Sequence, residues 1–284
     1  MKNLEIAVIK EGLLANGFYG PTPLFDDYEI AALQKAVIET YKGSIKFQNS
    51  PTLAGILESA IPVGNPEHID KNLFKHYLCE FSKEPFVEKI FKIFLGDKIR
   101  VSKFIDFRIN LAGNKTSYST GWHQDVETYY SEVGDEFGFE SLTMWIALSH
   151  ATINNSLEFV PGSHKFRKIY PTVYSDREKS LEKVTGGEFL NNFNTVSFEC
   201  SPGDVMFIDP YILHRSKTDE TEASRFSIDI RYVSLGNQGY RNRVPSLVKL
   251  AKAQKNIRGF AIQVLALLRI KNVAKSIRKY LFRK

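Results

Sequence analysis

The chain has 284 residues, of which 43% are hydrophobic and 25% charged, as in an ordinary globular protein long enough for one large domain. No uncharged run reaches the ~18 apolar residues of a membrane span, and no charged segment followed by an apolar run opens the chain. We therefore expect neither a membrane span nor a signal peptide. Cys79 and Cys200 form no metal or redox motif, which is typical of reduced thiols in a cytoplasmic protein.

Positive charge is concentrated at the C-terminal end. Of the 38 Lys and Arg residues, 13 lie in residues 241–284, which contain no Asp or Glu. Residues 1–240 therefore hold 25 basic against 32 acidic residues and are net acidic, although the whole chain carries a formal charge of +6. Any attraction to a polyanionic partner thus belongs to the tail and not to the body.

The first third of the chain is expected to be mainly helical. A turn is expected at residues 17–21, followed by a helix that Asp26 or Asp27 can cap. Residues 43–70 contain several Pro and Gly and are expected to form a loop with short helical pieces. Two more helices are expected over residues 71–80 and 83–95.

Short alternating strands follow, separated by closely spaced turns. They are expected over residues 100–111, 120–126, 142–148, 157–160, 196–200, 205–208, 212–215 and 224–233. No clear helical pattern lies between them, which disfavours a parallel α/β sheet and favours a β-sandwich or a double-stranded barrel. A long polar segment, residues 165–192, interrupts the strands and is expected to be a functional lid or a disordered loop.

An imidazole and a carboxylate stand two residues apart in Gly121-Trp122-His123-Gln124-Asp125. On a β-strand, residues i and i+2 point to the same face, so His123 and Asp125 are expected to converge. With a second histidine they would form a 2-His-1-carboxylate triad, which leaves open coordination positions on Fe(II). Alone the motif is weak, because His and Asp occur at this spacing by chance in many proteins.

His214 is the best candidate for the second histidine. It follows an apolar strand near the end of the strand region, where it can reach the first pair across a barrel. His68 and His76 precede the strands altogether. His150 and His164 occur in turns after strands, where a structural hydrogen bond is the simpler interpretation.

Eleven residues after His214, Arg225 opens a strongly alternating strand. Alternation sends Arg225, Ser227 and Asp229 to the face opposite the apolar residues. A planar guanidinium can hold the distal carboxylate of a 2-oxo acid with two parallel hydrogen bonds, and Ser216 can add a hydroxyl donor. In isolation, Arg225 would instead be interpreted as a surface charge at a strand end.

Taken together, these motifs resemble the phytanoyl-CoA dioxygenase family of Fe(II)/2-oxoglutarate-dependent oxygenases, over about residues 14–235. The resemblance implies a mainly β fold with flanking helices. Its core would be a double-stranded β-helix (jelly-roll, cupin-like) at about residues 98–235, with the helices packed on one of the two sheets. The expected domains are an oxygenase domain, 1–240, and a basic amphipathic helical tail, 241–284. The motifs that carry the resemblance are His123-Gln124-Asp125, Leu142–Leu148, Phe159–His164, Pro202-Gly203-Asp204, His214-Arg215-Ser216 and Arg225–Tyr232.

The same resemblance implies roles for individual residues. The iron ligands would be His123, Asp125 and His214. The residues around 2-oxoglutarate would be Arg225 and Ser216 at its distal carboxylate, with Gln124 and Trp145 lining its pocket. The implied reaction consumes O₂ and converts 2-oxoglutarate to succinate and CO₂ while a substrate C–H bond is hydroxylated or otherwise oxidised.

Two details of the motifs modify this expectation. Halogenating enzymes of this chemistry replace the carboxylate ligand by a small residue that opens a chloride site, so Asp125 disfavours halogenation. The chain also departs from the usual family pattern. Asn155-Ser156 stands where Asn-Gly is usual, and the segment between Asp125 and Trp145 is longer.

The substrate is expected to be a small polar or glycan-like molecule. Residues 126–141 mix acidic and aromatic side chains, which would suit a polar, hydroxylated or cationic ligand if they form a lid, although a solvated loop fits equally well. Arg108 and Asn110 are weaker pocket candidates. Two alternatives stay open. One is a cupin-type metalloprotein with non-oxygenase chemistry, and the other is a catalytically silent fold-mate that binds a membrane or partners through its tail.

The tail, residues 245–284, has a helical pattern with a dense apolar cluster flanked by basic residues. It is interpreted either as a surface helix packed on the body or as a peripheral contact with the anionic inner face of a membrane. Nucleic-acid binding is disfavoured because no aromatic stacking pattern accompanies the basic residues. Nothing in the sequence indicates an oligomeric state.

Overall fold

The structure is a computed structural model that describes ten segments of the chain, all within one compact unit, Met1–Gln238. Several expectations fall outside these segments, namely the loop at 43–70, the acidic residues at 127–140 and the tail at 245–284. The described segments are 6–42, 71–102, 105–110, 121–126, 141–166, 169–170, 172–173, 183–184, 193–217 and 223–234.

Helices dominate the N-terminal part, as expected. Helix α2 begins with a reciprocal cap, in which the Glu29 amide donates to Asp26 Oδ1 at 2.9 Å and the Asp26 amide donates to Glu29 Oε2 at 2.8 Å. Of the two predicted caps, Asp26 is therefore the one that acts. Helix α5 ends at Gly96, whose φ of 83° favours glycine. The helices of the described residues are α1 (Ile6–Asn16, not predicted), α2 (Asp27–Lys42), α4 (Lys71–Ser82) and α5 (Pro85–Leu95).

The turn expected at residues 17–21 is wrong, because these residues belong to strand β1 (Phe18–Pro23). Strand β1 pairs antiparallel with β9 (Asp204–Ile208) at the edge of the larger sheet, with a register shift between Tyr19 and Thr22. Glycine and proline are tolerated at an edge strand and at such irregularities. The local composition indicated a turn, but pairing with a distant strand decides the conformation.

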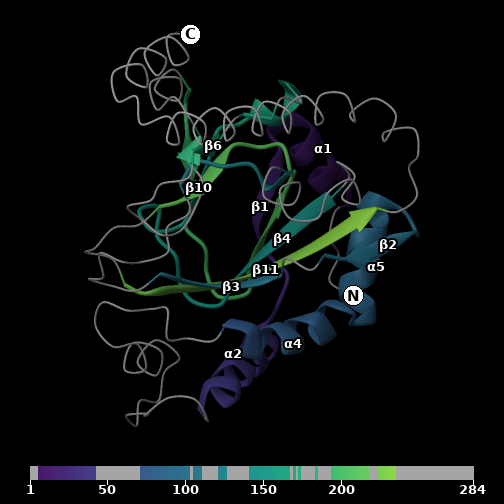
Figure 1. Ribbon diagram of the computed structural model, residues 1–284, viewed down its shortest axis with the longest axis vertical. Coiled ribbons are helices and arrows are strands. Elements are labelled where there is room, and N and C mark those ends of the chain that lie inside the picture. The colour runs from purple at the N-terminus through teal and green to yellow at the C-terminus, as the bar shows by residue number, and fades with distance from the viewer. Residues whose placement is uncertain are drawn as a thin grey trace, which may run out of the picture. The chain divides into compact units, whose positions relative to one another are not determined.

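The larger sheet is antiparallel and has the strand order β1-β9-β4-β11-β2, with β3 also paired to β11. Figure 1 shows two of its strands, β4 and β11, side by side. The long strand β11 (Arg225–Ser234) lies inside the sheet, between β4 (Ser141–Ala147) on one side and β2 and β3 on the other. The single strand expected over 100–111 is divided into β2 (Ile99–Val101) and β3 (Asp106–Asn110), which pair with successive parts of β11.

The smaller sheet has the order β10-β5-β8, formed by β10 (His214–Ser216), β5 (Leu157–Phe159) and β8 (Val196–Ser197). Two isolated bridges extend it, one between His123 and His214 and one between Ala151 and Cys200. The remaining elements are a 3₁₀ helix, η3 (Ser163–Phe166), and a short hairpin of β6 (Thr172–Val173) and β7 (Lys183–Val184), which lies within the segment expected to lack regular structure.

Alternation along β11 separates the two faces of the larger sheet. Its apolar residues join one buried cluster with α1, α2, α4 and α5, so the helices cover that face. The opposite face, toward the smaller sheet, carries a second cluster that includes Trp145, Phe159 and Ile212. The jelly-roll fold with helices packed on one sheet is confirmed. No helix among the described residues combines the length and apolarity needed to cross a membrane.

Candidate metal centre

His123 and His214 are neighbours through their backbones. The His123 amide donates to the His214 carbonyl at 2.9 Å, and the His214 amide donates to the His123 carbonyl at 3.1 Å. His123 makes only this single bridge, and a helical turn begins at Asp125. The strand expected over 120–126 is therefore wrong, and the histidine and the carboxylate do not converge by strand alternation.

The convergence comes instead from the turn that follows the bridge. The Val126 amide donates to the Pro210 carbonyl at 3.0 Å, which fixes this turn against the chain just before β10. As a result Asp125 Oδ1 lies 3.8 Å from His123 Nε2 and 3.9 Å from His214 Nε2. All three residues are buried, and their ligand atoms lie within 4.8 Å of one another.

Both imidazoles are held in the orientation that a metal site requires. Nδ1 of His123 lies 2.8 Å from the Gly121 carbonyl, and Nδ1 of His214 lies 3.1 Å from the Ile212 carbonyl. Since a carbonyl only accepts, each Nδ1–H donates and each Nε2 keeps its lone pair toward Asp125. Burial, with help from the neighbouring His214, lowers the pKa of His123 to about 3, so this ring is neutral.

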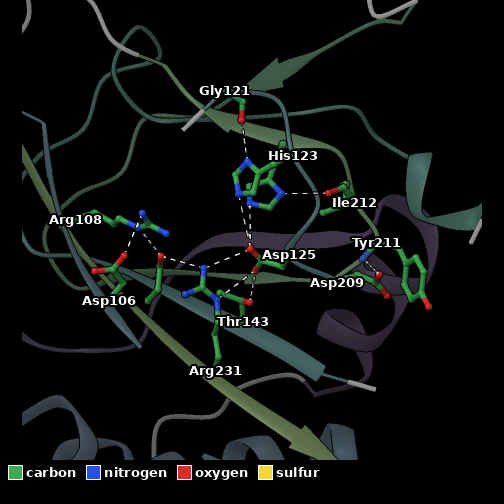
Figure 2. Close-up of polar contacts among 12 residues, drawn as sticks. Asp106, Arg108, Gly121, His123, Asp125, Thr143, Asp209, Tyr211, Ile212 and Arg231 are labelled. Carbon is green, nitrogen blue, oxygen red and sulfur yellow. Dashed lines mark hydrogen bonds and ion pairs between the residues drawn. The ribbon is translucent and has the colours of Figure 1, made fainter. Parts of the chain in front are cut away.

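Asp125 is held as a carboxylate by two donors on the larger sheet (Figure 2). Thr143 Oγ1 donates to Oδ2 at 2.6 Å, and Arg231 reaches Oδ2 through Nε at 3.4 Å and Oδ1 through Nη2 at 3.3 Å. Burial opposes ionisation, but Arg231 and the two histidines outweigh it and lower the pKa of Asp125. Asp125 is therefore held as a carboxylate.

A chain of ion pairs continues from Arg231 along the inner face of β11 and β3. Arg231 Nη2 lies 3.2 Å from Asp229 Oδ2, which also accepts from Arg108 Nε at 2.9 Å, and Arg108 Nη1 lies 3.1 Å from Asp106 Oδ2. Figure 2 shows Arg108 between Asp106 and the centre of the site. Side-chain exposure falls from 30% at Asp106 to 2% at Asp125, so the chain runs from solvent to the buried triad.

A cavity open to solvent lies at this point, with an empty volume of about 320 Å³ that includes the solvent at its mouth. Its wall combines the triad and most of the ion-pair chain with a smaller apolar part. The lining residues are Arg108, His123, Asp125, Thr143, Trp145, Leu157, Ile208, His214, Ser216, Asp229 and Arg231. Arg108 was predicted as a weaker pocket candidate, and the structure places it in the wall.

Arg225 lies behind this wall. It is 1% exposed, its Nη2 donates to Ser216 Oγ at 3.5 Å, and its guanidinium lies 5.7 Å from the centre of the Trp145 ring. Ser216 and Trp145 both line the cavity, so the structure brings three of the predicted 2-oxoglutarate residues together. Burial lowers the pKa of Arg225 to about 10, which leaves it charged at neutral pH.

Gln124 is placed differently. Its Nε2 donates to the Tyr211 carbonyl at 2.6 Å and its Oε1 accepts from the Tyr170 amide at 2.8 Å, so both ends of the amide hold backbone segments together. It is fully buried and is not among the lining residues. His164 has the structural role expected of it, since its Nε2 contacts the Leu14 carbonyl at 3.1 Å.

Sequence reasoning missed Thr143 and Arg231. Arg231 continues the alternation that was recognised for Arg225, Ser227 and Asp229, so a signal for it was present. Thr143 had no signal of its own, because it lies beside Arg231 only through the pairing of β4 with β11.

The donor set can hold a metal ion. Within the described residues, this is the one cluster of His, Cys, Asp and Glu side chains that could ligate a metal. It offers two imidazole nitrogens and one carboxylate oxygen. Two buried polar atoms on the same face, Trp145 Nε1 and Ser227 Oγ, have no hydrogen-bond partner within the described segments. Buried polar atoms are normally satisfied, and of these two residues Trp145 lines the cavity, so a polar ligand there is a suitable partner for its indole N–H.

Comparison with known proteins agrees with this geometry. Curated relatives include a probable phytanoyl-CoA dioxygenase from Caenorhabditis elegans, 27% identical over 55% of this chain and 51% of the relative. The peroxisomal phytanoyl-CoA dioxygenase of Homo sapiens is 28% identical over 58% of this chain and 47% of its own. The chain thus spans about half the length of the curated relatives it matches.

Solved structures share the fold at lower identity. EctD from S. alaskensis, crystallised with 2-oxoglutarate and 5-hydroxyectoine, matches with a TM-score of 0.56 and 18% identity over 84% of this chain and 79% of its own. The epimerase SnoN, crystallised with Fe³⁺, alpha ketoglutarate and nogalamycin RO, matches with a TM-score of 0.53 and 16% identity over 81% and 83%. The sequence model of the family named phytanoyl-CoA dioxygenase (PhyH) matches residues 13–227, three quarters of the chain, and the chain therefore belongs to that family.

Proposed function

We propose that this protein is a non-haem Fe(II)/2-oxoglutarate-dependent oxygenase. It would hydroxylate, or otherwise oxidise, a C–H bond of a small polar or glycan-like molecule, with succinate and CO₂ as co-products. The observation that carries the proposal is the convergence of His123, Asp125 and His214 in the cavity of a jelly roll that belongs to the phytanoyl-CoA dioxygenase family.

Iron would be held by His123 Nε2, His214 Nε2 and Asp125 Oδ1. Two imidazole nitrogens and one carboxylate oxygen suit Fe(II), and a relative in fold, SnoN, was crystallised with Fe³⁺. When bound, iron supplies the oxygen-activating chemistry, while the residues of this chain bind, orient and exclude water. The Nδ1 bonds to Gly121 and Ile212 orient the two rings without any metal.

2-Oxoglutarate would lie between the triad and Arg225. Arg225 offers a buried, charged guanidinium for the distal carboxylate, and Ser216 offers a hydroxyl beside it. Trp145 also lines the cavity, and its Nε1 is a buried donor that has no partner within the described segments. Gln124 would act indirectly, by fixing the backbone at Tyr211 and Tyr170 next to the site.

The proposed substrate class follows from the cavity wall. A long acyl chain would have to desolvate the ion-pair chain on β3 and β11, which is costly, whereas a hydroxylated molecule can exchange hydrogen bonds with it. The charged side chains that line the cavity also balance, with Arg108 and Arg231 against Asp125 and Asp229. A divalent cation and a dianionic co-substrate would therefore leave the cavity neutral, which favours a substrate without net charge.

Anaerobic titration with Fe(II) and then 2-oxoglutarate tests the cofactor assignment. We expect a visible charge-transfer band that requires both additions. A protein that binds metal but gives no band would be a cupin-type metalloprotein with other chemistry, and one that binds neither would be a catalytically silent fold-mate. Either result overturns the proposal.

A panel assay of succinate release tests the substrate class. Neutral glycosides and polyols, amino acids and phytanoyl-CoA are compared as stimulators of 2-oxoglutarate turnover. We expect stimulation by a member of the neutral hydroxylated group. Stimulation by phytanoyl-CoA alone would show that the charged wall does not select the substrate.

For the basic tail we propose a peripheral contact with an anionic membrane surface, on the cytoplasmic side. Support comes from the sequence alone, because residues 241–284 combine 13 basic residues with an apolar cluster and no acidic residue. Full-length protein and a variant ending at residue 240 are mixed with phosphatidylserine vesicles and sedimented. Equal partitioning of the two would remove the membrane contact.

A further inference from the structure

We propose that Thr143 and Arg231 are positioning residues that offer only one oxygen of Asp125, Oδ1, to the metal. By occupying Oδ2 they keep a coordination position open for the co-substrates. The inference rests on the proposed function, and it assigns a task to two residues outside the ligand set.

The contacts of Asp125 are unequal. Oδ2 accepts the short bond from Thr143 Oγ1 at 2.6 Å and a second, longer one from Arg231 Nε at 3.4 Å. Oδ1 receives Arg231 Nη2 at 3.3 Å and faces both imidazole Nε2 atoms. With two donors, Oδ2 has both of its lone pairs engaged, whereas Oδ1 accepts one donor and keeps a lone pair for a metal beside the two imidazoles.

The two donors are fixed by the sheet itself. Thr143 of β4 and Arg231 of β11 are directly opposite in the strand register, so their side chains emerge side by side on the inner face. Arg231 is held further by Asp229, two residues earlier on the same face, and Asp229 is held by Arg108 of β3. Thr143 and Arg231 together form the clamp on Asp125. The clamp therefore belongs to three paired strands and does not depend on a loop.

The clamp has a chemical consequence. A 2-His-1-carboxylate site works because it leaves open positions on the metal, and 2-oxoglutarate takes up some of them as a chelate. If Asp125 rotated and bound through both oxygens, it would close a position that O₂ needs. Outer contacts of this kind commonly change metal affinity or activity by about 10- to 100-fold.

Thr143→Val is the decisive variant, because valine keeps the β-branched shape in a buried strand and removes only the hydroxyl. Arg231→Met removes the second donor, and Arg231→Lys restores the charge with less suitable geometry. Two measurements are made on purified full-length protein. Mn(II) affinity is read from the loss of the free-ion electron paramagnetic resonance signal, and nitric oxide binding to the Fe(II)–2-oxoglutarate complex is read from its own signal.

The chain supplies a matched control. Glu158 is also held by a threonine and an arginine, but it lies outside the cavity. Thr195 Oγ1 donates to its Oε1 at 2.8 Å, and Arg215 Nε donates to its Oε2. Thr195→Val and Arg215→Met remove the same types of bond from a carboxylate that is not a ligand. Both should leave Mn(II) affinity and nitric oxide binding as in the wild type.

We expect Thr143→Val to weaken Mn(II) binding or nitric oxide binding at least about tenfold, Arg231→Met to do so more strongly, and Arg231→Lys to recover part of the loss. Wild-type values for a folded Thr143→Val protein in both measurements would overturn the inference, whether or not Arg231→Met folds. Mn(II) binding needs no 2-oxoglutarate. Failure of the proposed function, seen as a missing charge-transfer band in the wild type, is thus distinguishable from failure of the clamp.

Discussion

Arg225 Nη2 donates to Ser216 Oγ across 3.5 Å, and this contact joins the two sheets of the jelly roll. Ser216 ends β10 of the smaller sheet, while Arg225 begins β11 of the larger one. The two residues therefore mark the end of the barrel at which the sheets come together. A co-substrate that spans from the triad to this contact would touch both sheets.

The first prediction concerns Arg225→Gln. The variant should raise the Kd for 2-oxoglutarate by about 10- to 100-fold, because hydrogen bonds to a charged group contribute roughly 1.5–3 kcal/mol. Arg225→Lys should recover only part of this, since lysine lacks the planar fork. Anaerobic titration followed by visible absorption measures both.

A ligand control separates the distal carboxylate from the chelating end. 2-Oxobutyrate lacks the distal carboxylate, so wild type and Arg225→Gln should bind it with equal, weak affinity. A loss of 2-oxobutyrate affinity as large as that for 2-oxoglutarate would place Arg225 elsewhere in the mechanism.

The second prediction concerns His214→Gln. It should reduce Fe(II) affinity by at least about 100-fold, more than loss of an outer contact would. The fold should persist, because His214 is bridged to His123 through backbone atoms that glutamine also has. Metal titration and circular dichroism are compared with those of His150→Gln, which changes an exposed histidine. If His214→Gln retained wild-type affinity, the ligand assignment would be wrong.

The third prediction concerns the attachment of the helices to β11. Tyr232 donates its hydroxyl to the Ser82 carbonyl of α4 at 2.5 Å, and its ring lies 4.4 Å from that of Phe91 in α5. Tyr232→Phe leaves a buried carbonyl unsatisfied and should lower the free energy of unfolding by about 1–3 kcal/mol. Denaturant unfolding measures this, with the exposed Tyr28→Phe as a control expected to be neutral.

The fourth prediction concerns thiol reactivity. Burial raises the pKa of the Cys200 thiol to about 11, so only roughly one thiol in a thousand is thiolate at pH 8. Iodoacetamide should therefore leave Cys200 unmodified in the native protein and label it in denaturant. Because the thiolate fraction rises with pH, labelling should increase only as the pH approaches 11. Rapid native labelling at pH 8, read by peptide mass spectrometry, would contradict the buried position.

Alternation made much of β11 predictable. Apolar residues at every second position placed Phe226, Ile228 and Ile230 on the covered face, and the structure confirms this. The opposite face then had to hold Arg225 and Asp229, and charged residues on the inner face of a central strand indicate a site rather than a surface. The meeting of His123, Asp125 and His214 was predictable from residue type and chain order.

The local geometry of the triad was not predictable. Strand alternation was the wrong reason for the meeting of His123 and Asp125, because a bridge and a helical turn bring them together. The role of Thr143 depends on its register against Arg231, which is a property of two strands and is not encoded near either residue. Gln124 illustrates the same limit, since its partners are backbone atoms 46 and 87 residues away.

The bridge between His123 and His214 has a consequence for the lifetime of the protein. A metal held by both ends of this bridge acts as a cross-link between positions 91 residues apart, and the unfolded chain has no such site. At a hundred times its Kd, a metal that binds only the folded state stabilises it by about 2.7 kcal/mol. Metal supply would then govern how long each molecule resists proteolysis, as well as how fast it turns over.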